Sequence, residues 1–200
     1  MFQPSLLALD PLGSAPGVGA PLRTARRVEL GKGAWVDVVP SWVRGADLLF
    51  EAIRSDAPWR SRRRRMWDQV VDEPRLSTGT WSDPPPVVAD LADELTRHYA
   101  LDLGAVSANL YRDGRDSVAW HGDTLGRQVA TTIVAIVSLG SPRRFLIRPK
   151  GRGPSRRFEP SHGDLLVLGG TCQRTFDHAV PKMAGAGPRI SLMFREPGVF

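Results

Sequence analysis

The sequence predicts an α+β fold, in which N-terminal helices cover a double-stranded β-helix (jelly-roll) core and a flexible tail precedes both. From residue 105 onward, the chain is a series of short apolar and β-branched segments separated by turns. Apolar residues at helical spacing occur earlier, in segments 41–53 and 87–99. No repeat of fixed period is visible, and long-range pairing between such strands is typical of a double-sheet jelly roll.

The N-terminal elements follow from local composition. Residues 1–25 are rich in Gly, Pro and Ala, so we expect a tail or strap without regular structure. Residues 28–39 form strand-like segments around a turn at 31–33, and Ser41 is the expected N-cap of the helix that follows. Prolines 84–86 form a stiff connector before an amphipathic helix over 87–99.

The C-terminal elements are the core strands, which we expect at 105–111, 129–139, 144–148, 165–168 and 189–194. At 200 residues with 42% hydrophobic content, the chain can bury one sizeable core. We therefore expect one domain over 26–200, with an N-terminal part at 26–104 and the jelly roll at 105–200.

The balance of charge is basic, with a net charge of +6 and only three lysines, Lys32, Lys150 and Lys182, among the 27 basic residues. A planar guanidinium suits phosphate and carboxylate, so this bias favours a nucleic-acid partner. A coding bias toward Arg, Ala and Gly explains the preference equally well.

The densest basic run is Trp-Arg-Ser-Arg-Arg-Arg-Arg-Met-Trp at 59–67, which contains Arg62, Arg63, Arg64, Arg65 and Trp67. One interpretation is a solvated surface segment. The flanking tryptophans favour contact with nucleic acid, because rings stack on bases while guanidiniums meet phosphates.

Cysteine usage and hydropathy bound the compartment. Cys172 is the only cysteine, so an intrachain disulfide is impossible, and we expect a small core residue. The chain has no apolar run of 18 residues and no apolar leader after Met1. We expect a cytoplasmic monomer that does not bind a membrane.

One constellation carries chemistry. His121 and Asp123 are two residues apart, so their side chains share a face in extended backbone, and His178 must come from a different strand. Two imidazoles and one carboxylate on one face of a metal leave the opposite positions open, as in non-heme Fe(II) oxygenases. Zinc also accepts these ligands.

Arg189 and Arg195 make the constellation more specific. Six residues apart on one strand, they share a face, and their side chains can converge on carboxylates. A 2-oxo acid that chelates iron and supplies electrons needs such cations for its carboxylates, whereas a zinc hydrolase does not. Taken alone, the pair also fits an edge strand with charged ends.

Several motifs occur in a fixed order along the chain. They are Asn109-Leu110-Tyr111, the segment 116–123 that ends in His121-Gly122-Asp123, Ser161-His162-Gly163-Asp164-Leu165, His178-Ala179-Val180-Pro181-Lys182, and the segment 189–195, with Pro74-Arg75-Leu76 as an upstream motif. Through these motifs the chain resembles the AlkB family of Fe(II)/2-oxoglutarate dioxygenases, and the likeness spans residues 59–195.

The resemblance implies that His121, Asp123 and His178 ligate Fe(II), and that 2-oxoglutarate is held by Asn109, Tyr111, Arg189 and Arg195, with Ser191 where the family carries Asn. It implies an oxidative demethylase that uses O₂ and acts on bases such as 1-methyladenine and 3-methylcytosine in DNA or RNA. The methyl group leaves as formaldehyde and the cosubstrate as succinate and CO₂. The base must leave the stack to react.

Substrate contacts are less determined. Trp67, Arg75, Trp81 and Arg62 to Arg65 are candidates. Thr124 and Leu125 follow Asp123 where relatives acting on methylated bases often carry an acid. Two alternatives therefore stay open: an oxygenase of the same fold acting on a protein or small molecule, and an inactive nucleic-acid-binding metalloprotein.

Overall fold

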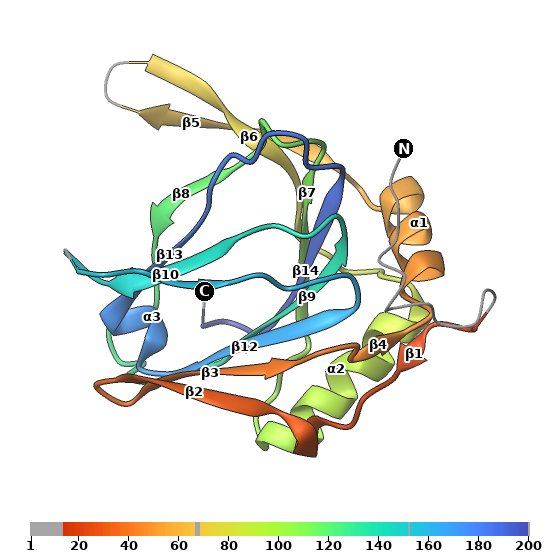
Figure 1. Cartoon of the computed structure of the whole chain (residues 1–200), viewed down its shortest axis with the longest axis horizontal. Helices are drawn as coiled ribbons and strands as arrows, with labels where there is room; N and C mark the ends of the chain where they lie inside the picture. The colour runs from red at the N-terminus through yellow and green to blue at the C-terminus, as the bar shows by residue number, and fades with distance from the viewer. Residues whose placement is uncertain (1–13, 67–68, 152, 200) are drawn as a thin grey trace.

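The computed structural model describes residues 14–66, 69–151 and 153–199, which fold into two facing antiparallel sheets with helices on one side (Figure 1). The large sheet has the order β2-β3-β12-β9-β14-β7-β6-β5 and the small sheet the order β11-β10-β13-β8. The large sheet comprises β2 (Arg26–Gly31), β3 (Ala34–Val39), β5 (Arg60–Met66), β6 (Gln69–Thr80), β7 (Ala105–Tyr111), β9 (Val134–Gly140), β12 (Asp164–Gly170) and β14 (Arg189–Arg195). The small sheet comprises β8 (Val118–His121), β10 (Phe145–Pro149), β11 (Arg156–Phe158) and β13 (Phe176–Val180).

The large sheet separates two apolar cores. Along β14, Ile190, Leu192 and Phe194 pack in the core on the helix side. Met193 packs in the other core, together with Phe145 of the small sheet. Because successive side chains of a strand point to opposite faces, the polar residues of β14 face the space between the sheets. This arrangement confirms the predicted α+β jelly roll.

The helices cover the large sheet. They are α1 (Ala46–Asp56) and α2 (Pro86–Tyr99), while α3 (Cys172–Thr175) is a short turn beside the small sheet. Pro86 opens α2 at a position where a missing N–H costs nothing. Leu91 and Leu95 of α2 are fully buried, which stabilises the fold by about 2 kcal/mol each. None of the described helices is long and apolar enough to span a membrane.

Two predictions for the N-terminal part are wrong. Ser41 does not cap α1, because its N–H donates to Asp164 Oδ1 at 2.9 Å and holds a separate turn. The helix begins at Ala46 after Gly45, whose φ of 62° and close contact with the backbone of Ser14 leave no room for a Cβ. Residues 14–25 are also more regular than expected. They form β1 (Gly17–Val18), paired with β4 (Val43–Arg44), and a 3-10 turn, Leu22–Thr24, whereas residues 1–13 lie outside the described chain.

The expected strand that differs most in its bounds is the one at 129–139, and the strand that follows the basic run was not predicted. The strand expected at 129–139 begins only at Val134, because the preceding residues form a turn in which the Val129 N–H donates to the carbonyl of Gly126. The sequence also gave no sign of β6, which pairs with β5 and places the basic run in a hairpin. This hairpin projects from the body of the molecule (Figure 1).

Candidate active site

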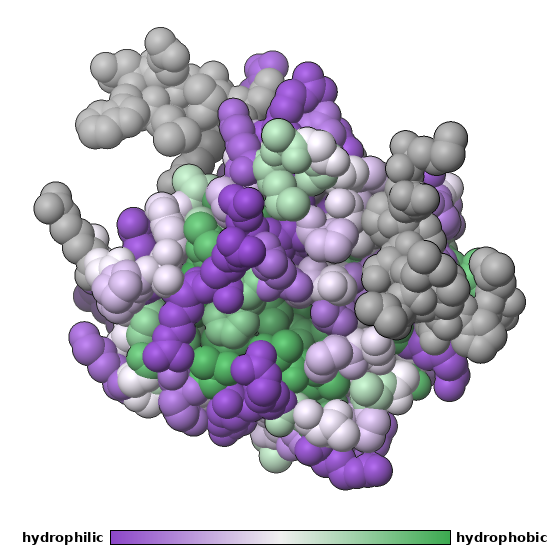
Figure 2. Space-filling view, in the orientation of Figure 1, coloured by the Kyte–Doolittle hydropathy of each residue, from purple (hydrophilic) through white to green (hydrophobic). Residues whose placement is uncertain are grey.

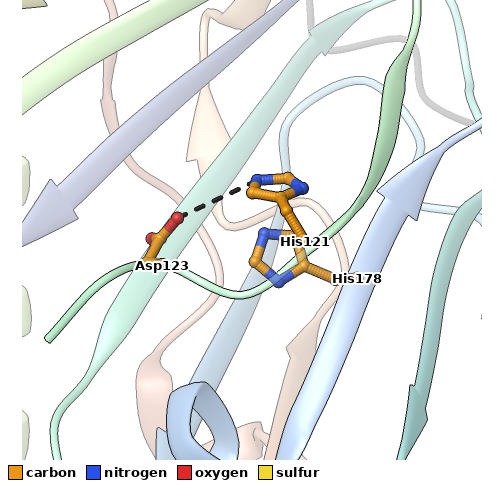
Figure 3. Close-up of side chains that lie close together, drawn as sticks. All are labelled: His121, Asp123 and His178. Atoms are coloured by element: carbon orange, nitrogen blue, oxygen red, sulfur yellow. Dashed lines mark ion pairs between the residues drawn. The ribbon is translucent and has the colours of Figure 1, made fainter. Parts of the chain in front are cut away.

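The three predicted metal ligands meet between the sheets. His121 ends β8, Asp123 follows it, and His178 lies opposite His121 on the neighbouring strand β13. One ligand atom from each lies within 4.8 Å of the others, and the side chains point toward one another (Figure 3). The two imidazole centroids are 4.3 Å apart.

Local contacts orient each ligand. Nδ1 of His121 lies 2.9 Å from the carbonyl oxygen of Ala119, which only accepts, so Nδ1 donates this hydrogen bond and Nε2 is the nitrogen available to a metal. The ring of Phe145 stacks on His178 at a centroid distance of 5.4 Å. The Asp123 N–H donates to Gln173 Oε1 at 3.2 Å. The chain therefore holds the set in place with its own groups.

Electrostatics favour the metal-binding protonation states. Burial would raise the pKa of Asp123, but Arg195, at 3.2 Å, and the two imidazoles outweigh it and lower the pKa overall. Burial and the neighbouring His121 lower the pKa of His178 to about 3. A neutral imidazole and an ionised carboxylate are the forms that ligate metals, so this donor set fits Fe(II).

A cavity of about 490 Å³ opens from these ligands. Its walls include the inward-facing residues of β7 and β14 that the family resemblance assigns to 2-oxoglutarate, namely Asn109, Tyr111, Ser191 and Arg195. Apolar side chains such as Ile136 and Val180 complete the walls. On the face shown in Figure 2, hydrophilic residues surround a hydrophobic centre.

Arg189 is buried behind Tyr111, with its Cζ 5.3 Å from that ring's centroid, and is not itself among the residues that line the cavity. Its side chain is 1% exposed, and Nη2 donates to Ser138 Oγ at 2.8 Å. Within the described chain, its Nε and Nη1 find no hydrogen-bond partner. Buried donors are normally satisfied, and a guanidinium fork matches a carboxylate. The arrangement fits the distal carboxylate of a dicarboxylate such as 2-oxoglutarate.

Arg195 occupies the end of the cavity nearer the metal ligands. Its Nη1 donates to Ser107 Oγ at 2.8 Å, and its Nε and Nη2 donate to Asp123 Oδ2 at 3.3 and 3.2 Å. The two arginines thus lie on one face of β14, as the six-residue spacing predicted, but their guanidiniums donate to different groups.

The predicted substrate contacts have mixed outcomes. Arg62 and Arg75 line the cavity, and Arg75 pairs with Glu73 at 3.0 Å. Trp81 is 8% exposed and packs in the helix-side core, so its prediction as a stacking residue is wrong. Arg63 is exposed on β5. Arg64 and Arg65 continue that strand, although their side chains, like the whole of Trp67, lie outside the described structure.

Sequence reasoning missed three residues that hold the site. Ser138 binds Arg189, Ser107 binds Arg195, and Gln173 binds the Asp123 backbone. The two serines had a signal, because each is a polar residue in a strand of apolar ones. Gln173 had none, since only the fold brings α3 against the loop after β8.

Comparison with known proteins agrees with this geometry. Residues 46–195 match the 2OG-Fe(II) oxygenase superfamily. The chain is 31% identical to the alpha-ketoglutarate-dependent dioxygenase alkB homolog 3 of Bos taurus, over 76% of this chain and 62% of that protein. It is 30% identical to the DNA oxidative demethylase ALKBH2 of Arabidopsis thaliana, over 60% of this chain and 46% of that protein. It thus spans less than two thirds of either relative.

A solved structure shows the same fold. The 2OG-Fe(II) oxygenase family oxidoreductase from Burkholderia pseudomallei superposes with a TM-score of 0.54 at 14% identity, covering 80% of this chain and 84% of that one. Fe(II), 2-oxoglutarate and O₂ are the cofactor and cosubstrates of that family, and the predicted resemblance to AlkB proteins is confirmed. The chain belongs to the 2OG-Fe(II) oxygenase superfamily, in which its curated relatives are AlkB homologues.

Proposed function

We propose that this protein is an Fe(II)- and 2-oxoglutarate-dependent demethylase of N-alkylated bases, of the 1-methyladenine and 3-methylcytosine type, in DNA or RNA. The observation that carries the proposal is one cavity with two features. It holds three convergent metal-ligand atoms, and a buried guanidinium with unused donors lies beside it. The name of the ALKBH2 relative, a DNA oxidative demethylase, supports the reaction.

Residues at different positions in the site would bind the metal and the cosubstrate. His121, Asp123 and His178 would hold Fe(II), which with 2-oxoglutarate and O₂ supplies the oxidising power that hydroxylates the methyl group. Arg189, held by Ser138, would bind the distal carboxylate of the cosubstrate. Asn109, Tyr111, Ser191 and Arg195 would complete its binding site.

Arg195 and the apolar walls of the cavity also affect the electrostatics of the site. Arg195 keeps Asp123 ionised and fixes its carboxylate through two donors on one oxygen. Apolar side chains such as Ile136 and Phe145 line part of the cavity and lower the local dielectric, which strengthens the electrostatic interactions there.

The β5–β6 hairpin is the proposed nucleic-acid contact. Its first strand carries Arg60 and Arg62 to Arg65, and Arg62 also lines the cavity, so the basic surface continues to the reaction site. Such charge would meet phosphates next to an extruded base.

Replacing Arg62 to Arg65 with alanine is expected to weaken binding of a single-stranded oligonucleotide at least about tenfold at low salt and to flatten the salt dependence. Each phosphate contact contributes to the slope of log K against log salt. A matched control removes four exposed arginines elsewhere, Arg23, Arg54, Arg97 and Arg115. If the two quadruple variants lost the same affinity for the oligonucleotide, the hairpin would contribute to binding only through the net charge of the protein.

The direct test of the reaction uses iron-loaded protein, 2-oxoglutarate and O₂ with oligonucleotides carrying 1-methyladenine or 3-methylcytosine. We expect formaldehyde and the unmodified base in equal amounts. If succinate formed without repair of either DNA or RNA strands, the protein would still be an oxygenase, but methylated bases would not be its substrate.

A second candidate, an oxygenase of the same fold acting on a protein or small molecule, has one observation in its favour. Thr124 and Leu125 follow Asp123, and Leu125 is buried at 8% exposure. Among the cavity-lining residues that the structure describes, Asp123 and Glu196 are the acids. Succinate formation that depends on a peptide or metabolite, with no repair of oligonucleotides, would favour this candidate.

A further inference from the structure

A second buried arginine lies behind the cosubstrate end of the cavity. Arg143 belongs to the turn between β9 and β10, and its side chain is 1% exposed. It is not among the residues that line the cavity, and each of its hydrogen bonds goes to a main-chain carbonyl group. Burying a guanidinium is costly unless its donors are satisfied. In the described structure, both Nη atoms of Arg143 are hydrogen-bonded, whereas its Nε finds no partner.

Arg143 is held by main-chain carbonyl groups from two separate segments. Nη1 donates to the carbonyl of Asp113 at 3.1 Å, and Nη2 donates to those of Asp116 and Pro181 at 2.7 and 2.9 Å. The carboxylate of Asp116 is occupied by Arg112, whose Nε and Nη2 lie 2.8 and 2.9 Å from it. The guanidinium of Arg143 therefore cross-links backbone segments.

Those segments are the ends of the two strands that carry the histidine ligands. Asp116 lies two residues before β8, and Pro181 directly follows β13. The two strands pair at Val118 with Val180 and at His121 with His178, and the register shifts between these pairs. Because the pairing of β8 with β13 is short and irregular, it has few hydrogen bonds of its own. Nη2 of Arg143 joins the two strands at the end opposite the histidines by binding one carbonyl from each side.

The same guanidinium lies beside the proposed cosubstrate site. Arg143 Cζ is 5.5 Å from the centroid of the Tyr111 ring, and Arg189 Cζ is 5.3 Å from the same centroid. Tyr111 is 2% exposed and lines the cavity. Arg143 thus contacts both the Tyr111 ring and the ends of the strands β8 and β13, so a substitution there affects both directly.

We propose that Arg143 is a positioning residue that couples the two halves of the active site, setting the β8–β13 register for metal binding and the Tyr111 ring for 2-oxoglutarate. The inference rests on the proposed function for the identity of the two bound groups. It predicts that loss of the guanidinium weakens both binding events together, although Arg143 contacts neither group.

The test measures binding by Arg143→Met and Arg143→Lys in the full chain without nucleic acid. Co²⁺, a spectroscopic substitute for Fe(II), is titrated by its visible absorption, and 2-oxoglutarate is then titrated by calorimetry into the Co²⁺-loaded protein. Loss of a residue that orients metal ligands typically costs ten- to a hundredfold in affinity. We expect both dissociation constants to rise about tenfold in Arg143→Met and less in Arg143→Lys, whose ammonium keeps the charge.

A matched control is Arg112→Met, which removes an ion pair to Asp116 from the same loop, whereas the cations recorded at the Tyr111 ring are Arg143 and Arg189. It should bind both Co²⁺ and 2-oxoglutarate with wild-type affinity. A purely structural role for Arg143 would lower the melting temperature and leave both constants unchanged. Wild-type affinity for either Co²⁺ or 2-oxoglutarate in either folded variant overturns the proposal. If Arg143→Met does not fold, the affinities of Arg143→Lys decide the outcome.

This outcome is separate from that of the repair assay. Failure to demethylate oligonucleotides would remove the proposed substrate and leave the binding result standing. If the wild-type protein repaired oligonucleotides and the Arg143 variants bound both ligands unchanged, the proposed function would stand and only the role of Arg143 would be refuted.

Discussion

Replacing His121 with alanine is expected to abolish metal-dependent turnover while the protein stays folded. Its side chain is 36% exposed, so truncation leaves little cavity in the core. It removes one of three ligand atoms that lie within 4.8 Å of one another. Because loss of a mere partner of a ligand costs up to about a hundredfold, loss of the ligand itself should cost more. Turnover is measured as formaldehyde release and metal content by elemental analysis.

The control for His121→Ala is Thr124→Ala. Thr124 is exposed, lies in the same loop directly after Asp123, and contributes no ligand atom. It should retain wild-type turnover and metal content. If His121→Ala kept even a tenth of the activity, the metal would have to be held elsewhere.

Replacing Arg189 with methionine is expected to separate stability from cosubstrate binding. Arg189 is fully buried with two guanidinium nitrogens unpartnered in the described structure. Exchange of such a charge for an apolar side chain of similar size is often neutral or stabilising. We expect the free energy of unfolding of the ligand-free protein to be unchanged or higher. Binding of 2-oxoglutarate should weaken by about 3 kcal/mol, roughly a hundredfold, because its carboxylate loses a buried charged partner.

The measurements for Arg189→Met are urea denaturation of the ligand-free protein and calorimetric titration with 2-oxoglutarate. Arg148→Met is the matched control, since the Arg148 guanidinium lies over the Trp120 ring at 4.1 Å and is not part of the cavity wall. Its affinity for 2-oxoglutarate should not change. Undiminished affinity in Arg189→Met would show that the distal carboxylate binds elsewhere.

Spacing predicted which of the metal and cosubstrate side chains share a face of a strand, and the resemblance to AlkB proteins supplied their roles. Along β14, alternation puts Arg189, Ser191 and Arg195 on one side and Ile190 and Leu192 on the other, whatever the rest of the fold. The pair His121 and Asp123 obeys the same rule on extended backbone. Spacing does not determine the convergence with His178, which results from the pairing of β13 with β8.

Residues whose role depends on tertiary packing could not be predicted in this way. Trp81 adjoins the hairpin in sequence, yet it is buried in the helix-side core, because its N–H donates to the Val106 carbonyl and fixes it beside β7. Gln173 and Arg143 act on segments 50 and 27 residues away, at Asp123 and Asp116. No local pattern marks such contacts. Ser41 failed as an N-cap for a similar reason, since Asp164, 123 residues away, holds its N–H.

The measurement that tests the central claim most directly is absorption spectroscopy of the protein under anaerobic conditions. Fe(II) and 2-oxoglutarate are added separately and then together. If His121, Asp123 and His178 leave half of the coordination sphere free for a keto acid anchored by Arg189, a visible charge-transfer band should develop only when both are present, and it should need roughly a hundredfold more 2-oxoglutarate in Arg189→Met. Iron that binds without producing this band at saturating 2-oxoglutarate would contradict the account.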